Sequence, residues 1–303
     1  MNSTNQVPVV IFVYKRLTTL KKVIESLLEN KEASTTDLIF ISDGPKNSIE
    51  TPLVDEVRSY ILDLKGFQSV KLESNEINFG LANSYLIGVT KVFLDYDKAI
   101  FLEDDNYVSK HFLFYMKSAL LKYENVSKVG CISGFSYPTP LLKRKPYFLR
   151  GAETWSFATW RRVWNSFEMD PVKLKSQIER TNKKRVLNMY GFDFYKMLEM
   201  QIAGEIDSWG VRWWANAVCQ DLLCLHPAKP HCVNIGWGPD GSHVQGKTVM
   251  HSKISKLETN RKLIWLNKPR PSHVMHVYLR TYNAIEKFKS ILYLTFSNSN
   301  RKL

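Results

Sequence analysis

The sequence predicts an α/β protein with a mainly parallel central sheet and flanking helices. In the first 110 residues, short apolar runs rich in β-branched residues alternate with stretches in which apolar residues recur every three or four positions. Three of the short runs end at polar clusters, as expected where parallel strands end at one edge of a sheet. The length of 303 residues fits one such domain with an appendage.

The predicted elements alternate regularly through the first half of the chain. The first strand covers Pro8–Tyr14, and a helix follows in which apolar residues are spaced helically from Leu20 to Leu28. Thr18 and Thr19 are suited to cap this helix. The elements that follow are predicted as strand Asp37–Ser42, helix Leu53–Leu64, strand Ser69–Glu73, helix Leu81–Leu94 and strand Lys98–Leu102.

The second half is less regular. It contains a Pro-rich and basic segment, Tyr137–Leu149, an aromatic segment, Trp155–Trp164, and a Gly-rich segment, Asn234–His243. The regular elements expected here are helix His111–Tyr123, strand Val129–Ser133 and helical stretches near Phe192–Ile202 and Asp207–Gln220.

The end of the chain is strongly basic. The formal net charge is +13, and residues 251–303 contribute +9 of it, with eleven Lys or Arg against two Glu. Such a segment favours polyanions or forms an ordinary solvated surface, and because no nucleic-acid-binding motif accompanies it, we expect no nucleic-acid partner. Val274, Tyr278, Ile285 and Phe288 predict an amphipathic helix, which could lie on an anionic membrane or pack on its own domain.

None of the four cysteines form a C-x-x-C pair. We expect them to be reduced thiols in a reducing compartment. Cys219, Cys224 and Cys232 do not have the spacing of a structural zinc site with the nearby histidines. The sequence shows no signal peptide and no apolar run long enough to cross a membrane. We therefore expect a cytoplasmic protein, either free or peripheral at the inner face of the membrane.

Three consecutive acids, Glu103, Asp104 and Asp105, follow the apolar run 99–102. Adjacent carboxylates at the end of a buried strand are costly unless a cation or hydrogen-bond donors satisfy them. Carboxylate oxygens are the ligands that Mg²⁺ and Mn²⁺ prefer, and such an ion commonly bridges to phosphate. The motif predicts a divalent metal site, and the alternative is a solvated acidic turn.

The order of four motifs resembles the GT-A glycosyltransferases, particularly bacterial family 2-like enzymes. These motifs are the first strand, Ser42–Pro45, Asn78–Asn83 and Phe101–Asp105, and the Glu-Asp-Asp form is similar to that of N-acetylglucosaminyltransferase I. The resemblance covers roughly residues 7–245. It implies a GT-A domain over residues 1–250, with a nucleotide-sugar-binding half (7–125), an acceptor-binding half (126–250) and a basic C-terminal extension (251–303).

The resemblance also implies roles around the nucleotide sugar. Arg16 would approach the diphosphate and Asp43 the base, although each could instead be a surface or turn residue. Asp105 would bind the metal, with His243 as a further ligand. The other residues implied in the nucleotide-sugar pocket are Asn78, Gly80, Asn83, Glu103 and Asp104.

The acceptor half should supply a general base. Asp207 resembles the family's acid beside a Trp at the start of a helix, with Glu205 and Glu153 as rivals and a helix cap as the alternative role. The aromatic segment resembles the one that floors the sugar pocket, although its residue after the Trp is Ser156 where relatives often have Gly. The residues implied in the acceptor and sugar pocket are Glu153, Trp155, Trp160 and Trp209.

Together these features predict an inverting glycosyl transfer from a nucleotide-diphosphate sugar, with UDP as the expected nucleotide and Mn²⁺ or Mg²⁺ as cofactor. The resemblance implies a hydroxyl of a glycan or lipid-linked glycan as acceptor, in the biosynthesis of a surface polysaccharide. Three alternatives stay open at this point: a nucleotidylyltransferase, a non-catalytic nucleotide-sugar-binding module and a nucleic-acid-binding protein. The first would normally have a Gly-rich loop where this chain has Tyr14, Lys15 and Arg16.

Overall fold

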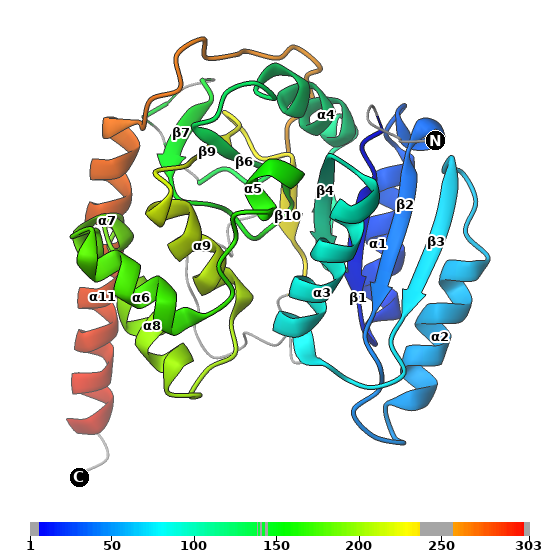
Figure 1. Cartoon of the computed structure of the whole chain (residues 1–303), viewed down its shortest axis with the longest axis horizontal. Helices are drawn as coiled ribbons and strands as arrows, with labels where there is room; N and C mark the ends of the chain where they lie inside the picture. The colour runs from blue at the N-terminus through cyan, green and yellow to red at the C-terminus, as the bar shows by residue number, and fades with distance from the viewer. Residues whose placement is uncertain (1–5, 138, 140, 143–144, 237–256, 300–303) are drawn as a thin grey trace.

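The structure is a computed structural model that describes residues 6–137, 139, 141–142, 145–236 and 257–299, with side chains up to residue 289. Figure 1 shows a central sheet between layers of helices, with the last helix standing at one side of the molecule and strands β1–β3 at the other. The predicted α/β fold of GT-A type is confirmed.

Eight strands of the described residues form the central sheet, in the order β3-β2-β1-β4-β8-β6-β9-β7. Their bounds are β1 Val9–Val13, β2 Asp37–Ser42, β3 Ser69–Ser74, β4 Lys98–Glu103, β6 Val129–Ser133, β7 Tyr147–Arg150, β8 Phe157–Trp160 and β9 Leu223–His226. The first four strands are parallel to one another, whereas β8 is antiparallel to both β4 and β6. A separate antiparallel pair joins β5, Asn106–Val108, to β10, Cys232–Asn234.

Helices connect and cover the strands. The longer ones are α1 Leu17–Leu28, α2 Thr51–Leu62, α3 Gly80–Asp95, α4 Phe112–Lys122, α6 Pro171–Arg180, α8 Phe194–Ile202, α9 Trp209–Cys219 and α11 His273–Ser299. Shorter helical segments are η1 Ala33–Thr35, α5 Arg161–Trp164 and α7 Lys184–Leu187. The predicted cap of α1 is wrong: Arg16 occupies the N-cap, and the Thr19 hydroxyl donates to the Arg16 carbonyl from within the first turn.

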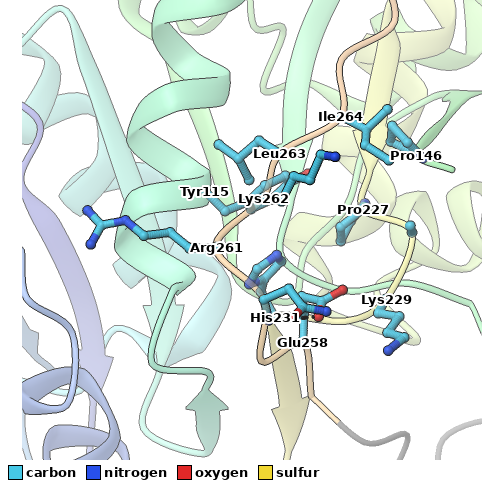
Figure 2. A pocket seen from close by; sticks show the side chains of 12 residues that line it. Tyr115, Pro146, Pro227, Lys229, His231, Glu258, Arg261, Lys262, Leu263 and Ile264 are labelled. Atoms are coloured by element: carbon cyan, nitrogen blue, oxygen red, sulfur yellow. Dashed lines mark hydrogen bonds between the residues drawn. The ribbon is translucent and has the colours of Figure 1, made fainter. Parts of the chain in front are cut away.

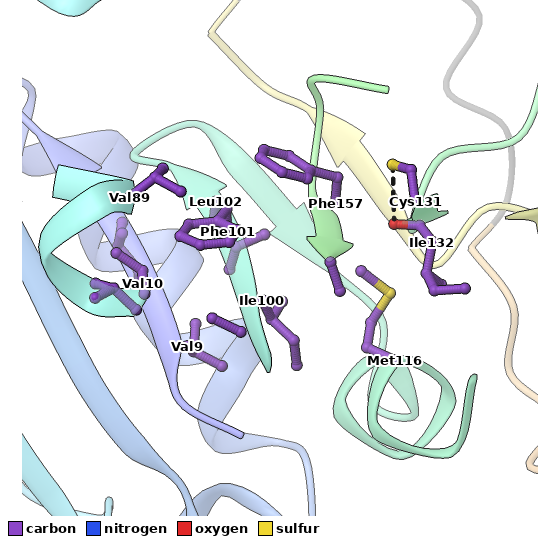
Figure 3. Close-up of a cluster of buried hydrophobic side chains, with 14 of the residues drawn as sticks. Val9, Val10, Val89, Ile100, Phe101, Leu102, Met116, Cys131, Ile132 and Phe157 are labelled. Atoms are coloured by element: carbon purple, nitrogen blue, oxygen red, sulfur yellow. Dashed lines mark hydrogen bonds between the residues drawn. The ribbon is translucent and has the colours of Figure 1, made fainter. Parts of the chain in front are cut away.

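Two apolar clusters hold the layers together. The first contains the central strands and the helices against them, including Val10, Phe101 and Phe157, whose packing Figure 3 shows. The second lies between β7 and α6–α9 and takes in Leu198 and Trp214. Burial of these side chains is the main driving force for folding, and it places the strand ends at a common edge.

The C-terminal extension packs on the domain over its described part. Trp265 and Leu266 pack against the first cluster, and Met275 and Leu279 of α11 are buried in the second. In Figure 1 the orange segment before α11 crosses one end of the molecule, and α11 then runs beside α6, α7 and α8. Within the described residues, no helix combines the length and the hydropathy required to cross a membrane.

Candidate active site

The ends of β1, β2 and β4 bring the predicted nucleotide residues together. Phe12 of β1 is opposite Glu103 of β4, so the residues that follow the two strands lie at the same edge. A cavity of about 340 Å³ opens there. It is lined by Phe12, Val13, Tyr14, Lys15, Arg16, Ile41, Asp43, Lys46, Asn78, Gly80, Leu81, Ser84, Glu103 and Asp104.

Arg16 is the cation of the acidic turn. Its guanidinium pairs with the Asp104 carboxylate, and its Nη1 lies 2.9 Å from Asp105 Oδ2. Burial alone would lower the pKa of Arg16, but the charges of Asp104 and Asp105 outweigh burial and raise it. Burial raises the pKa of Asp104 to about 6 even though Arg16 opposes the shift. Burial therefore disfavours the ionised form of Asp104, and Arg16 is the charge that favours it.

Asp105 is enclosed by β5 and β10. Its Oδ1 accepts hydrogen bonds from the side-chain amides of Asn106 and Asn234, both at 2.9 Å. Its carbonyl accepts from Ile235 N–H at 2.8 Å, and a Cβ on Gly236 would lie 2.3 Å from Asp105 Oδ2. Glycine is therefore required at position 236 for this close approach, and Asn234 is a site residue that the sequence analysis did not single out.

The acidic turn has ligand chemistry suited to Mg²⁺ or Mn²⁺. In the described residues, no three His, Cys, Asp or Glu side chains converge as a protein-only metal site. A hard divalent ion bound with substrate phosphate needs only one or two carboxylates, however. The Arg16 guanidinium already places a positive charge against Asp105 Oδ2, so the turn accommodates a cation at that point. The other predicted ligand, His243, lies outside the described residues.

Asp43 organises the neighbouring loop. Its Oδ1 accepts from Phe79 N–H at 2.9 Å and Gly44 N–H at 3.1 Å, and its Oδ2 accepts from Gly80 N–H at 2.8 Å. The Asp43 carboxylate, which lies on another loop, thereby accepts hydrogen bonds from N–H groups at the start of α3 that have no partner within the helix. Oδ1 also accepts from the Asn75 side-chain amide at 3.4 Å, so among the described residues Oδ1 has three donors and Oδ2 has one. Because each carboxylate oxygen has two lone pairs, one on Oδ2 is left for a ligand donor.

Asn78 and Gly80 hold the other side of the cavity. The Asn78 amide donates to the Gly44 carbonyl at 2.7 Å. Gly80 has φ +77, a conformation that favours glycine, and no atom lies within 4 Å of where its Cβ would be. The space over Gly80 is therefore open to a ligand.

One predicted nucleotide residue lies apart, and three others were missed. Asn83 is exposed, does not line the cavity, and donates to the Phe79 carbonyl at 3.1 Å. Ser84 does line it, is 4% exposed, and its hydroxyl has no hydrogen-bond partner among the described residues. Lys15 and Lys46 add positive charge to the rim. The i,i+4 spacing of Gly80 and Ser84 is a signal that could have identified this face of the helix.

Comparisons with known proteins identify the family of this chain. The family model for glycosyl transferase family 2 matches residues 9–187, which is more than half of the chain. The chain belongs to glycosyl transferase family 2. No curated protein sequence matches it significantly.

Solved structures similar to this family 2 chain share little sequence with it. They include Staphylococcus aureus TarS 1-349 (12% identity, 53% of this chain and 48% of that one, TM-score 0.37). A second is the mannosyltransferase PcManGT from Pyrobaculum calidifontis, in complex with GDP-Man and Mn²⁺ (12% identity, 53% and 46%, TM-score 0.38). A third is GalNAc-T7 with UDP, GalNAc and Mn²⁺ (17% identity, 55% and 37%, TM-score 0.41). The matched region thus spans about half or less of these chains.

A stack of three aromatic rings connects the region that the family model matches to the start of α9. Tyr85 of α3 lies between Phe12 and Trp209, with ring centroids 3.7 Å and 4.0 Å away and nearly parallel planes. The Tyr85 hydroxyl donates to Glu103 Oε1 at 3.3 Å. Burial and the charges of the neighbouring Asp105 and Asp104 raise the pKa of Glu103. Trp209 is the first residue of α9, so the stack brings the start of α9 to the acidic edge.

Asp207 lies two residues before this helix and outside the region matched by the family model. Ser208, rather than Asp207, is the N-cap of α9, and its hydroxyl accepts from Val211 N–H. The Asp207 side chain is 56% exposed and pairs with Arg212 at 3.2 Å. Asp207 therefore has a carboxylate open to solvent near the ring stack, and Glu205 is also exposed.

The aromatic segment reaches the acidic turn through Ser156. Its N–H donates to the Asn106 side chain at 3.0 Å, and Asn106 in turn donates to Asp105. Ser156 has φ 41, in the left-handed region that glycine adopts without strain. The adjacent Trp155 packs edge-on against Phe135, with centroids 5.5 Å apart. Trp155 does not line the 340 Å³ cavity, and its position near the sugar stays a prediction.

Trp160 lies at the opposite edge of the sheet from the acidic turn, and Glu153 is buried and bound to backbone N–H groups. Trp160 is opposite Lys98, at the far end of β4 from Glu103, and is 3% exposed. Because β8 runs antiparallel to β4, Trp160 points to the wrong edge of the sheet, and we do not retain it in the sugar pocket. Glu153 is 8% exposed, and its Oε1 accepts from the N–H groups of Thr154 and Trp155.

Proposed function

We propose that this family 2 protein transfers a sugar from a UDP-sugar to a hydroxyl of a glycan or lipid-linked glycan, with inversion and with metal assistance. One observation carries the proposal. Residues from three separate strand ends, chosen from sequence motifs as nucleotide-sugar ligands, line a single 340 Å³ cavity beside the acidic turn. Such a cavity at the carboxyl ends of parallel strands is where α/β proteins bind nucleotides.

The chain's own residues have distinct tasks in this proposal. Asp43 uses the free acceptor position of Oδ2 to bind the base, and the open space over Gly80 receives the nucleotide. Asp104 faces the ribose or sugar. Asp207 is the general base: its carboxylate removes the proton of the acceptor hydroxyl, which attacks from the side opposite the leaving group.

Asp105 would hold Mn²⁺ or Mg²⁺, with His243 as a proposed further ligand. The bound ion would neutralise the negative charge that grows on the departing diphosphate. Arg16 now occupies the cation position against Asp105, so we propose that it exchanges its carboxylate partners for the diphosphate when the donor binds. Lys15 and Lys46 at the cavity rim favour the same anionic group.

A thermal-shift titration tests this proposal. UDP-sugars with Mn²⁺ should raise the melting temperature by several degrees, because binding to the folded state at about 100 times Kd adds roughly 2.7 kcal/mol of stability. The shift should disappear in Asp105→Ala and persist in the control Asp63→Ala, which changes an exposed acid at the end of α2. An equal shift without metal, or in Asp105→Ala, would contradict the proposed metal role, and no shift with any nucleotide sugar would contradict the donor class.

We also propose that the protein acts at the cytoplasmic face of a membrane, through α11. The helix buries Met275 and Leu279, whereas Val277, Ile285 and Phe288 on its other face are 50%, 49% and 62% exposed. Exposed apolar residues on a helix in a basic segment favour an anionic bilayer surface. Co-sedimentation with phosphatidylglycerol vesicles should fall in Val277→Ser/Phe288→Ser. Equal co-sedimentation of this variant and the wild type would contradict the proposal.

A further inference from the structure

A second cavity lies away from the donor site, between α4, the loop 227–231 and the segment 257–272 that leads into α11, here called the tail segment. Its volume is about 510 Å³. Figure 2 shows the lining side chains, with Lys229 on the loop and Lys262 on the tail segment. The residues that line it are Tyr115, Pro146, Pro227, Ala228, Lys229, His231, Glu258, Asn260, Arg261, Lys262, Leu263 and Ile264.

The tail segment is fastened on both sides of this cavity. Glu258 N–H donates to the Pro230 carbonyl at 2.8 Å, and the Tyr123 hydroxyl donates to the Leu266 carbonyl at 2.9 Å. Between them, Arg261 pairs with Glu32 at 2.7 Å and lies over the Phe114 ring. The cavity wall is therefore held by specific contacts with three separate parts of the domain.

The inner wall is a stacked pair of rings. His231 lies against Tyr115 with centroids 4.5 Å apart and planes within 6°, and its Nδ1 is 2.8 Å from the Ser109 hydroxyl. Burial, with the nearby His111, lowers the pKa of His231 to about 3. The imidazole is therefore neutral, and its Nε2, which has no hydrogen bond to any described residue, is the edge that a ligand can meet.

The rim of the cavity is positively charged. Lys229 and Lys262 come from opposite segments, are exposed, and have no carboxylate partner among the described residues. The acidic side chain of the described lining is Glu258, whose Oε1 accepts from the N–H groups of Thr259 and Asn260. Two ammonium groups without a carboxylate partner among the described residues therefore line the cavity. The carboxylate of Glu258 already accepts hydrogen bonds from the backbone.

The remaining walls are apolar and come from Pro146, Pro227 and Ile264. Ammonium groups bind phosphate as point charges, and apolar walls favour a ligand with a non-polar body. The geometry points to a second binding site, for a phosphate ester joined to an apolar group, with Lys229 and Lys262 on the phosphate and His231 at the inner end. This site does not depend on the proposed transferase activity.

The cavity is connected to the acidic turn by the β5–β10 pair. His231 N–H and Cys232 N–H both donate to the Gly134 carbonyl at the cavity end. At the other end, Asn234 donates to Asp105. These ends are separated by about 10 Å at the rise of a strand. A ligand in the cavity would therefore contact one end of a short ribbon whose other end holds the proposed metal ligand.

Isothermal titration with phenyl phosphate tests the site. Binding should weaken about tenfold in Lys229→Ala/Lys262→Ala and stay unchanged in Lys268→Ala, an exposed lysine of the tail segment outside the cavity. UDP-sugar shifts should be the same in all three proteins, which separates this site from the donor cavity. Because these lysines are exposed, the variants should fold like the wild type, and unchanged melting temperatures would verify this.

A parallel titration with phosphatidylcholine vesicles containing phosphatidic acid identifies the source of the phosphate. Phenyl phosphate binding that depends on the two lysines supports a soluble ester, and lysine-dependent binding to the vesicles alone supports a lipid headgroup. If neither ligand binds more weakly to the double variant than to Lys268→Ala, the site does not exist. A failed UDP-sugar shift together with lysine-dependent phosphate binding would sink the proposed transferase but leave this inference standing.

Discussion

Two buried carboxylate sites of the molecule are stabilised in different ways. Asp104 and Asp105 are 3% and 5% exposed and share the guanidinium of Arg16. Glu153 is equally enclosed, but its Oε1 accepts only from two backbone N–H groups, and no cation pairs with it in the described part of the chain. The first site therefore has a cation that favours the ionised carboxylates, whereas among the described residues the second has only backbone hydrogen bonds.

The comparison separates the candidates for the general base. Burial raises the pKa of Glu153 to about 7, and the N–H groups of Thr154 and Trp155 oppose the shift. A pKa near 7 suits a general base at neutral pH, but the Glu153 side chain is only 8% exposed and gives an acceptor hydroxyl little access. Asp207, like Glu205, is exposed, and it pairs with Arg212, so its carboxylate is accessible to an acceptor hydroxyl and stays our proposed base.

The largest expected effect follows from this choice of base. Asp207→Asn keeps the size of the side chain and removes its basicity, so kcat should fall on the order of 10³-fold while the UDP-sugar thermal shift stays unchanged. Steady-state kinetics with the donor and an acceptor would measure this, with Asp63→Asn as the exposed control. Full turnover of Asp207→Asn would exclude it as the base and return Glu205 and Glu153 to consideration.

The next effect tests the proton on Glu153. Its pKa of about 7 in the folded protein is higher than the ordinary glutamate value of 4.5, so between about pH 4.5 and 7 the folded state holds a proton that the unfolded chain releases. Glu153 should therefore lower the free energy of unfolding as the pH rises through this window, by about 3 kcal/mol. Because burial also raises the pKa of Glu103 and Asp104, urea unfolding of Glu153→Gln should show a decrease that is smaller by this amount, whereas exposed Glu56→Gln should retain all of it. The same pH slope in wild type and Glu153→Gln would show that Glu153 is ionised throughout.

The two halves also differed in how well the sequence predicted them. The four parallel strands β1–β4 were predicted to within two residues. β1, β2 and β4 are buried, mostly apolar runs, and the more exposed β3 follows a helix with clear periodicity. Strands β7, β8, β9 and β10 were not predicted, because they span only three or four residues and pair with partners far along the chain. Short antiparallel strands have no local signal comparable to a βαβ unit.

The residues of the candidate site also differ in how well the sequence predicted their positions. Strand-end residues such as Asp43 and Asp104 could be placed from sequence, because the edge of a parallel sheet fixes where they lie. Asn83 was misplaced, because it lies on a different face of α3 from Gly80 and Ser84, whose i,i+4 spacing is the signal that identifies the cavity face. Trp160 could not be placed, because its position depends on the antiparallel direction of β8. The pairing of Arg16 with the acids follows from the register of β1 and β4, which no motif encodes.

A smaller effect concerns the first site's scaffold. Asp43→Ala removes the acceptor for the N–H groups of Phe79 and Gly80, so the start of α3 loses its partners. The free energy of unfolding should fall by about 2 kcal/mol, and donor affinity should fall with it. Chemical denaturation and the thermal-shift titration would measure the two effects, with Asp63→Ala as control. An unchanged stability would mean that water replaces the carboxylate at these N–H groups.

The smallest effect has opposite signs for stability and binding. The buried Ser84 hydroxyl lines the donor cavity and has no partner among the described residues, so Ser84→Ala removes an unsatisfied polar group. Stability should rise by up to about 1 kcal/mol while UDP-sugar affinity falls a few-fold, since the hydroxyl would meet the donor. Ser26→Ala is the matched control: its buried hydroxyl bonds Val23 O and Val108 N, so this variant should lose stability and keep its affinity. If Ser84→Ala is destabilised and binds the donor normally, the hydroxyl serves the fold and does not contact the nucleotide sugar.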